Sequence, residues 1–203
     1  MTTEQTLKEY EIEADNVKIT VRVVKRDTDF VLNYELDFPE YEKGTEALLL
    51  TMKRHIISDS SVRTDKMLDP QFISTLKEIF RKKALDILQK EVPKLDEQTR
   101  NSLAGVLLQE MVGLGKIEFL LSDDNIEEIV INQAKYPVWV YHKEFGWLKT
   151  NIVIPHEDVI HNYASIIARR IGKQITVLSP LLDAHLITGD RANATLFPIS
   201  GKG

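Results

Sequence analysis

The first third of the chain alternates apolar and polar residues. In the run NVKITVRVV, Val17, Ile19, Val21 and Val23 alternate with polar side chains, and the β-rich run FVLNYELDF follows after KRDTD. An alternation of period two is typical of a strand with one buried face. The two runs therefore predict a β-hairpin.

Three helical patterns follow this hairpin. The run EKGTEALLLTMKRHII spaces its apolar residues as a helix does, and Asp69 with Pro70 then places an N-cap carboxylate before a proline at the first helical position. From there apolar residues recur at three- and four-residue spacing as far as Pro93, which predicts an amphipathic helix. Asp96 can cap the next helix, which ends before Gly113. The last two patterns together predict a helical hairpin.

Strand patterns return after Gly115. The runs EEIVINQ and YPVWVYHKEFGWLKT predict short strands, and PHEDVIHNYASIIARRIGK predicts a helix with acids in its first turn and arginines in its last. The runs LLDAHLI and RANATLF flank Gly189, which suits a tight turn between two strands. This part of the chain is predicted to form antiparallel strands with one packed helix.

The predicted fold class is α+β, in three successive units. Residues 1–60 hold the β-hairpin and a helix, residues 61–115 the helical hairpin, and residues 116–203 the antiparallel sheet with its helix. The polar stretch SDSSVRTDK separates the first unit from the second.

The composition mainly excludes certain kinds of site and of protein. The chain has 203 residues, of which 43% are hydrophobic, so it can bury a sizeable core. It has no cysteine, which excludes disulfides and thiolate metal sites. No apolar run approaches the roughly 20 residues that span a bilayer, and nothing marks the chain for export. A formal net charge of -5 argues against bulk binding of nucleic acid.

Two basic groups on predicted helices are candidate binding sites. Arg169 and Arg170 could contact an anion, although basic residues at a helix end also stabilise the helix dipole. Arg81, Lys82 and Lys83 could meet acidic lipid or a protein partner, although a short charge run on a helix is usually a solvated face. Both interpretations stay open for each group.

An acidic group and an aromatic group are weaker candidates. The acidic group, which could suggest a metal site, is explained more simply by a helix N-terminus enriched in acids; it consists of Asp123, Asp124, Glu127 and Glu128. The aromatic group could stack on nucleic-acid bases, but strand aromatics are far more often core residues or cross-strand pairs. It consists of Tyr136, Trp139, Tyr141 and Trp147.

The last residues, PISGKG, contain the Gly-Lys pair of a phosphate-binding loop. That loop requires a glycine, four free positions, and Gly-Lys followed by Ser or Thr. Here Leu196 occupies the place of the first glycine and Gly203 the place of the hydroxyl residue. The tail is therefore interpreted as a flexible glycine loop and not as a phosphate site.

Four blocks of sequence, taken in order, resemble a known family. They are VGLGKIEFLLSDDNIEEIVINQ, YPVWVYHKEFGWLKTNIVI, IIARRIGK and SPLLDAHLITGDRANAT. The series is similar to the N-terminal region of archaeal type II/IV secretion ATPases, the family of archaellum and pilus-assembly motors. The likeness is good from Gly113 to Thr195 and looser before it, and His185 departs from the residues common at its position.

The resemblance implies a hexameric ATPase in the cytoplasm, peripheral at the inner face of the membrane, that moves a membrane platform protein. ATP, Mg and the catalytic groups would be held by a RecA-like domain following this region, to which PISGKG would lead. The chain alone would then be inactive and hold no cofactor. Its C-terminal unit would be a PAS-like module that covers the nucleotide cleft.

The resemblance also suggests roles for individual arginines. Arg191 matches the arginine of the family's Arg-x-Asn-Ala stretch, and Arg169 and Arg170 match a basic helix end, which implies contacts with nucleotide phosphates. The alternative for Arg191 is a structural ion pair with Asp190 or Asp183.

The implied partners are the chain's own C-terminal ATPase domain, neighbouring subunits of the hexamer and the platform protein, with no nucleic acid. The hypothesis for platform docking uses Arg81, Lys82 and Lys83. An alternative function is a free-standing PAS-like module for protein interaction or ligand sensing.

Overall fold

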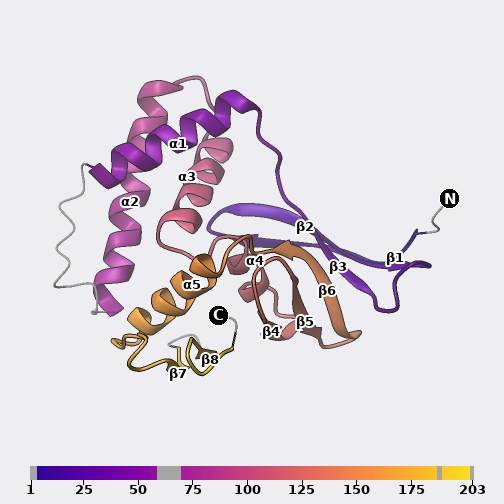
Figure 1. Cartoon of the computed structure of the whole chain (residues 1–203). Helices are drawn as coiled ribbons and strands as arrows, with labels where there is room; N and C mark the ends of the chain where they lie inside the picture. The colour runs from indigo at the N-terminus through magenta and orange to yellow at the C-terminus, as the bar shows by residue number, and fades with distance from the viewer. Residues whose placement is uncertain (1–3, 59–69, 187–188, 202–203) are drawn as a thin grey trace.

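The computed structural model describes residues 4–58, 70–186 and 189–201 (Figure 1). Within these ranges the chain forms a six-stranded mixed sheet, a two-stranded sheet and five helices, which confirms the predicted α+β class. In chain order the elements are β1 (Glu4–Ala14), β2 (Val17–Arg26), β3 (Asn33–Asp37), α1 (Lys43–Ser58), α2 (Pro70–Glu91), α3 (Glu97–Met111), α4 (Ile117–Leu121), β4 (Ile126–Val130), β5 (Pro137–His142), β6 (Gly146–Val153), α5 (Glu157–Arg170), β7 (Leu181–His185) and β8 (Arg191–Thr195).

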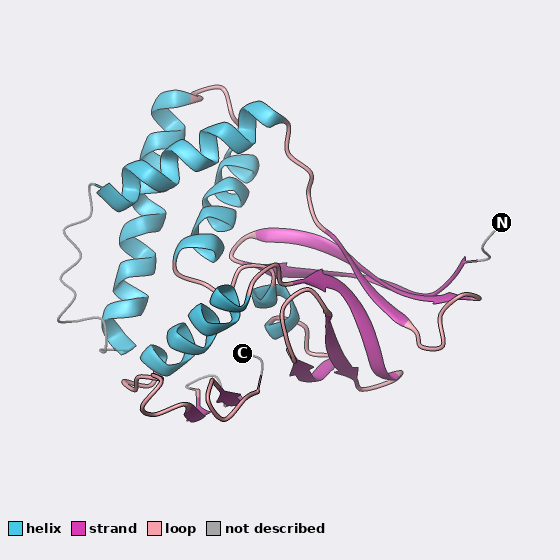
Figure 2. Ribbon diagram, in the orientation of Figure 1, coloured by secondary structure: helices cyan, strands magenta, loops and turns pink. Residues whose placement is uncertain are grey.

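The large sheet joins strands from distant parts of the sequence. Its strand order is β1-β2-β3-β6-β5-β4, and its neighbours are antiparallel except β3 and β6, which run parallel (Figure 2). β3 pairs with β6 through Asn33 with Lys149 and Tyr34 with Thr150. The early hairpin and the later strands, expected in successive units, therefore share one sheet. Local periodicity carries no information about such a distant pairing.

β1 is a strand that the sequence analysis did not predict. Tyr10, Ile12 and Ala14 alternate with exposed glutamates, and this pattern of period two is the signal that would have revealed it. β1 and β2 are joined by Asp15 and Asn16, whose φ angles are 52° and 66°. Positive φ at both positions is what a type I′ hairpin turn requires, and Asn and Asp tolerate it better than most residues.

The three long helices form a unit at one side of the sheet (Figure 1). The predicted helices are confirmed, and the carboxylate of Asp96 accepts a hydrogen bond from the backbone N–H of Thr99 as the predicted N-cap of α3. Asp69, the cap predicted for α2, lies outside the described residues. α4 was not predicted, because five residues are too few to show a helical period.

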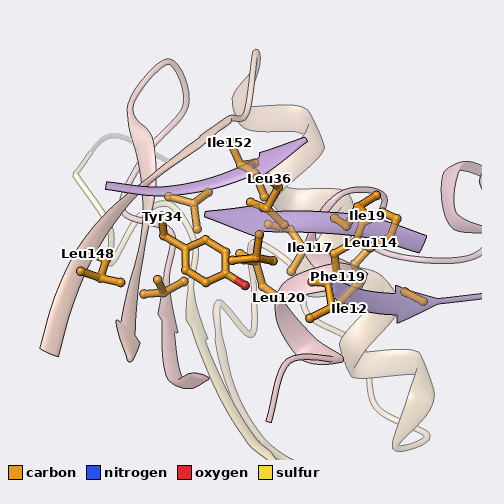
Figure 3. Packing of buried hydrophobic residues seen from close by; sticks show 14 of the residues in the cluster. Ile12, Ile19, Tyr34, Leu36, Leu114, Ile117, Phe119, Leu120, Leu148 and Ile152 are labelled. Atoms are coloured by element: carbon orange, nitrogen blue, oxygen red, sulfur yellow. The ribbon is translucent and has the colours of Figure 1, made fainter. Parts of the chain in front are cut away.

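Three hydrophobic clusters hold these elements together. The first packs one face of the large sheet against α4 and α5, and Tyr34, Leu36 and Leu148 are among its most buried side chains (Figure 3). The second fills the space between α1, α2 and α3. The third lies between α5 and the β7–β8 hairpin, where Ala164 and Ala168 allow a close approach. The hairpin is therefore attached to the sheet through α5.

The helical unit meets the sheet at the β1–β2 turn. Gly105 of α3 passes so close to this turn that a Cβ atom there would overlap the carbonyl oxygen of Asp15. The side-chain amide of Gln109, which is buried, donates to the carbonyl of Ala14 at 3.1 Å, and Lys77 of α2 forms an ion pair with Asp15 at 2.5 Å. A small residue in α3 is thus a geometric requirement of this contact.

A buried carboxylate joins β1, β3 and the turn after α4. Asp123 accepts hydrogen bonds from the hydroxyls of Tyr10 and Tyr34, both at 2.6 Å, and from the backbone and side-chain amides of Asn125, both at 2.9 Å. Burial opposes ionisation of Asp123, but the tyrosine and asparagine donors outweigh it and hold its pKa below the ordinary value. Burial, followed by the hydrogen bond to Asp123, raises the pKa of both tyrosines.

We expect Gly105→Ala to lower the free energy of unfolding by about 1–3 kcal/mol, because the added methyl group must displace the β1–β2 turn. The matched control is Gly44→Ala in α1, where a Cβ atom would meet nothing within 4 Å. That control should change stability by no more than about 1 kcal/mol, in the stabilising direction. Urea unfolding of both variants measures the difference, and equal effects would contradict the close contact.

We expect Asp123→Asn to lower the free energy of unfolding at pH 7 by about 1–3 kcal/mol, since it removes a buried charged acceptor. Because the folded-state pKa of Asp123 is depressed, its contribution is present above the unfolded pKa and disappears as the pH falls through the folded value. The wild-type chain should therefore lose more stability than the variant below about pH 4.

The control for the comparison of the wild-type chain with Asp123→Asn is Asp124→Asn, which changes the exposed neighbouring carboxylate. It should alter stability by less than about 0.5 kcal/mol. Urea unfolding between pH 3 and pH 7 compares the three chains, and parallel stability curves would contradict the assigned role of Asp123.

Candidate functional site

The β7–β8 hairpin has one buried and one exposed face. Leu182 and Ala184 point toward α5 and are buried. The opposite face is mostly polar, because Asp183 is in register with Asn193 and His185 with Arg191, and Leu181 is its apolar exception. The predicted hairpin is confirmed, although it forms its own two-stranded sheet and not part of the larger one.

Arg191 is held in place on this exposed face. Its Nε and Nη2 donate to the two carboxylate oxygens of Asp183, each at 3.0 Å, so the pair is bidentate. Hydrogen bonding to Arg191 lowers the pKa of Asp183, and the carboxylate raises the pKa of Arg191. The side chain of Arg191 remains 59% exposed, so it is oriented by the sheet and still accessible.

Exposed apolar side chains surround the same hairpin. They come from the segments before and after it and from the start of β7. They are Val177, Leu178, Leu181, Phe197 and Ile199, with Leu178 almost fully exposed at 97%. Large apolar residues gathered in one segment of a chain commonly mark a surface that another segment or protein covers.

Arg170 makes a different and more buried contact. Its Nη2 donates to Oε1 of Glu118 at 2.8 Å, and the same carboxylate oxygen accepts from the backbone N–H of Leu114 at 2.9 Å. Gly115, in the same turn, has a φ of 55°, and a Cβ atom there would lie 3.3 Å from the hydroxyl of Tyr163. Arg170 thus links the end of α5 to the turn before α4.

Arg169 and Arg191 share no partner with Arg170. The Nε of Arg169 donates to the carbonyl of Ser165 within α5, at 3.2 Å. The three arginines named as phosphate contacts therefore have three separate environments, and of the three only Arg191 combines a fixed geometry with high exposure. Glu118, which the sequence analysis did not single out, is the acidic partner that fixes Arg170.

The three basic residues of the run on α2 differ in exposure. Lys82 is exposed, whereas Arg81 and Lys83 are partly buried. The neighbouring residues Phe80 and Ala84 face the helical core. Platform docking by this run remains a prediction.

The acidic group does not begin a helix, so that explanation was wrong. Glu127 and Glu128 lie in β4, and Asp123 accepts the tyrosine and asparagine hydrogen bonds described above. Among the residues that the structure describes, no three His, Cys, Asp or Glu side chains are grouped so as to hold a metal ion. Among the same residues, no helix is long and apolar enough to cross a membrane.

Comparison with known proteins finds relatives but no matching family model. The chain is 33% identical over 129 residues to the uncharacterized protein MJ1288 of Methanocaldococcus jannaschii, a match covering 60% of this chain and 51% of that protein. It is 30% identical over 203 aligned residues to the uncharacterized protein MJ0781 of the same organism, covering 98% of this chain and 26% of that protein. The chain therefore spans about half the length of the first relative and about a quarter of the second.

We expect the arginines of α5 and β8 to differ in their contribution to stability. Arg170→Ala should lower the free energy of unfolding by about 1–3 kcal/mol, because it leaves Glu118 partly buried without its cation. Arg191→Ala should leave the melting temperature nearly unchanged, because exposed ion pairs contribute little. Thermal unfolding followed by circular dichroism measures both. A larger loss for Arg191→Ala would assign Arg191 to holding the hairpin together.

Proposed function

We propose that the chain is the N-terminal module of a hexameric secretion or filament-assembly ATPase and that it covers the nucleotide cleft of an ATPase domain. The observation that carries this proposal is the β7–β8 hairpin, where an accessible, oriented guanidinium is accompanied by exposed apolar side chains. The four sequence blocks of the resemblance support it, because they form α4, β4 to β6, the end of α5 and this hairpin.

Arg191 is the residue that would contact the nucleotide. A guanidinium matches phosphate oxygens through paired, planar hydrogen bonds, as it matches the carboxylate of Asp183 here. On docking, a phosphate would replace Asp183 as the bidentate partner, while Asp183 keeps the side chain in one orientation beforehand. The charge that develops on a transferring phosphoryl group is what such an arginine stabilises.

Arg170 would have a positioning role. Since it holds the last turn of α5 against the turn before α4, it fixes the helix on which the hairpin packs. Arg169, bonded within α5, is the weaker candidate for a phosphate contact. Arg81, Lys82 and Lys83 of α2 would meet the membrane platform protein or acidic lipid.

The catalytic machinery would be outside this chain. ATP and Mg would be bound by a RecA-like domain, and the ring would be a hexamer in the cytoplasm at the inner face of the membrane. The chain matches 26% of the length of MJ0781, so that relative has room for a further domain.

A second candidate is a free-standing PAS-like module for protein interaction or ligand sensing. The observation that favours it is the large sheet, whose second face carries no helix in the described part of the chain (Figure 2). The reading frame distinguishes the two candidates. A Gly-x-x-x-x-Gly-Lys-Ser/Thr motif in the same frame supports the ATPase, and its absence there supports the free-standing module.

We expect no ATP turnover by the 203-residue chain, and in the complete protein we expect Arg191→Ala to lower turnover by at least about tenfold. The matched control is Asp183→Asn, which removes the ion pair but keeps the guanidinium, and which should retain most of the activity. Phosphate release under saturating ATP and Mg measures the turnover of the 203-residue chain, the complete protein and its two variants.

Two results would contradict the proposed role of Arg191. One is unchanged turnover in Arg191→Ala. The other is an equal loss in Asp183→Asn and Arg191→Ala, since that would show that the ion pair matters and the free guanidinium does not. Turnover by the 203-residue chain that survives repurification would overturn the assignment of catalysis to another domain.

A further inference from the structure

The second face of the large sheet carries an aromatic patch. Along β5 and β6, buried residues alternate with Trp139, Tyr141 and Trp147, which point away from the hydrophobic core. Tyr141 is directly opposite Trp147 in the register, and their rings meet edge to face with centroids 5.4 Å apart. Trp147 is nevertheless 46% exposed and Tyr141 36% exposed. The pairing therefore leaves much of both rings accessible.

One carboxylate belongs to this patch. Glu128 of β4 is in register with Tyr141, and residues directly opposite in adjacent strands point to the same face. A row of Glu128, Tyr141 and Trp147 thus crosses three strands. Glu128 is exposed and forms no ion pair with any residue that the structure describes.

Two cations on this face are already paired. Lys149, opposite Trp139, lies with its Nζ 3.6 Å from a carboxylate oxygen of Asp29. Arg22, further along the same face, donates to Asp37 at 2.9 Å. Within the row of Glu128, Tyr141 and Trp147, the charge beside the rings is therefore the carboxylate of Glu128.

We propose that this patch binds an arginine- or lysine-bearing segment of a protein partner. The faces of Trp and Tyr rings attract cations, and a carboxylate beside the rings adds an ion pair to that attraction. The same chemistry occurs inside the chain, where the Nζ of Lys116 lies 4.3 Å from the ring centroid of Phe38. The proposal does not depend on an ATPase domain or on Arg191.

A nucleic acid is the less suitable occupant. Exposed strand aromatics can stack on bases, but single-strand binding surfaces combine them with a positively charged groove. Here Lys149 and Arg22 are paired with carboxylates, Glu128 forms no ion pair within the described residues, and the chain has a formal net charge of -5. A phosphate backbone would be repelled where an arginine side chain is attracted.

The two tryptophans of the chain are the reporters for the test. The sequence contains two, Trp139 and Trp147, and both lie on this face. Their emission is measured while the 203-residue chain is titrated with an acetylated hexapeptide of alternating arginine and threonine. Matched peptides carry citrulline or glutamate in place of arginine, and an oligothymidylate is titrated in parallel.

We expect the arginine peptide to bind at least about tenfold more tightly than the citrulline peptide, because citrulline has the same shape without the charge. Glu128→Gln and Trp147→Leu should each weaken binding by about threefold or more, with Trp139 reporting in the second variant. Glu78→Gln, an exposed carboxylate on α2, changes the net charge equally and should leave the affinity unchanged. Circular dichroism melting shows whether each variant is folded.

Four outcomes would overturn the proposal. Equal binding of the citrulline peptide would make the patch a purely apolar surface, and tighter binding of the oligothymidylate would make it a nucleic-acid surface. A third outcome is tryptophan emission that stays unchanged with up to about 10 mM arginine peptide, which means a binding free energy weaker than about -3 kcal/mol. Tyr141 and Trp147 would then be a structural cross-strand pair without a binding role. Light scattering shows whether a second copy of the chain occupies the face instead, which would also overturn it.

Discussion

The arrangement of this chain depends on the carboxylate of Glu118. It accepts a backbone hydrogen bond from Leu114, which shapes the turn leaving the helical unit, and an ion pair from Arg170 at the end of α5. α5 packs on both the large sheet and the β7–β8 hairpin. This one carboxylate therefore connects the helical unit to both of them through α5. Removing a partner from such a partly buried group leaves an unpaired charge, which costs more than an exposed pair contributes.

The same constraint separates the arginines by role. Arg170 is used to hold helices together, so its guanidinium is committed to Glu118. Arg191 forms a bidentate pair, but its partner Asp183 is about as exposed as Arg191 itself, so water can replace either. An oriented cation whose partner can be exchanged is suited to binding a ligand anion, whereas a cation enclosed between two elements is suited to structure.

The two surfaces proposed for binding lie on different elements and use different chemistry. The β7–β8 hairpin presents a guanidinium with apolar side chains around it, and it is attached through the small cluster beneath α5. The face of β4 to β6 presents aromatic rings with an unpaired carboxylate. A module that met an anionic site with one surface and a cationic segment with the other could contact two partners at once.

The sequence by itself determined the local elements. The period of apolar residues predicted α1, α2, α3 and α5 and most of the strands, and Asp96 predicted the N-cap of α3, because these features depend on neighbours within a few residues. The sequence also indicated Arg191 as a candidate phosphate contact, through the resemblance of four sequence blocks to secretion ATPases. Only the tertiary structure decided that β3 pairs with β6 and that Asp123 accepts hydrogen bonds from two tyrosine hydroxyls. It also decided that Arg170 pairs with Glu118 and does not lie beside Arg191. Each of these contacts joins residues far apart in the chain, and their choice of partner depends on how whole faces pack, which no local pattern records.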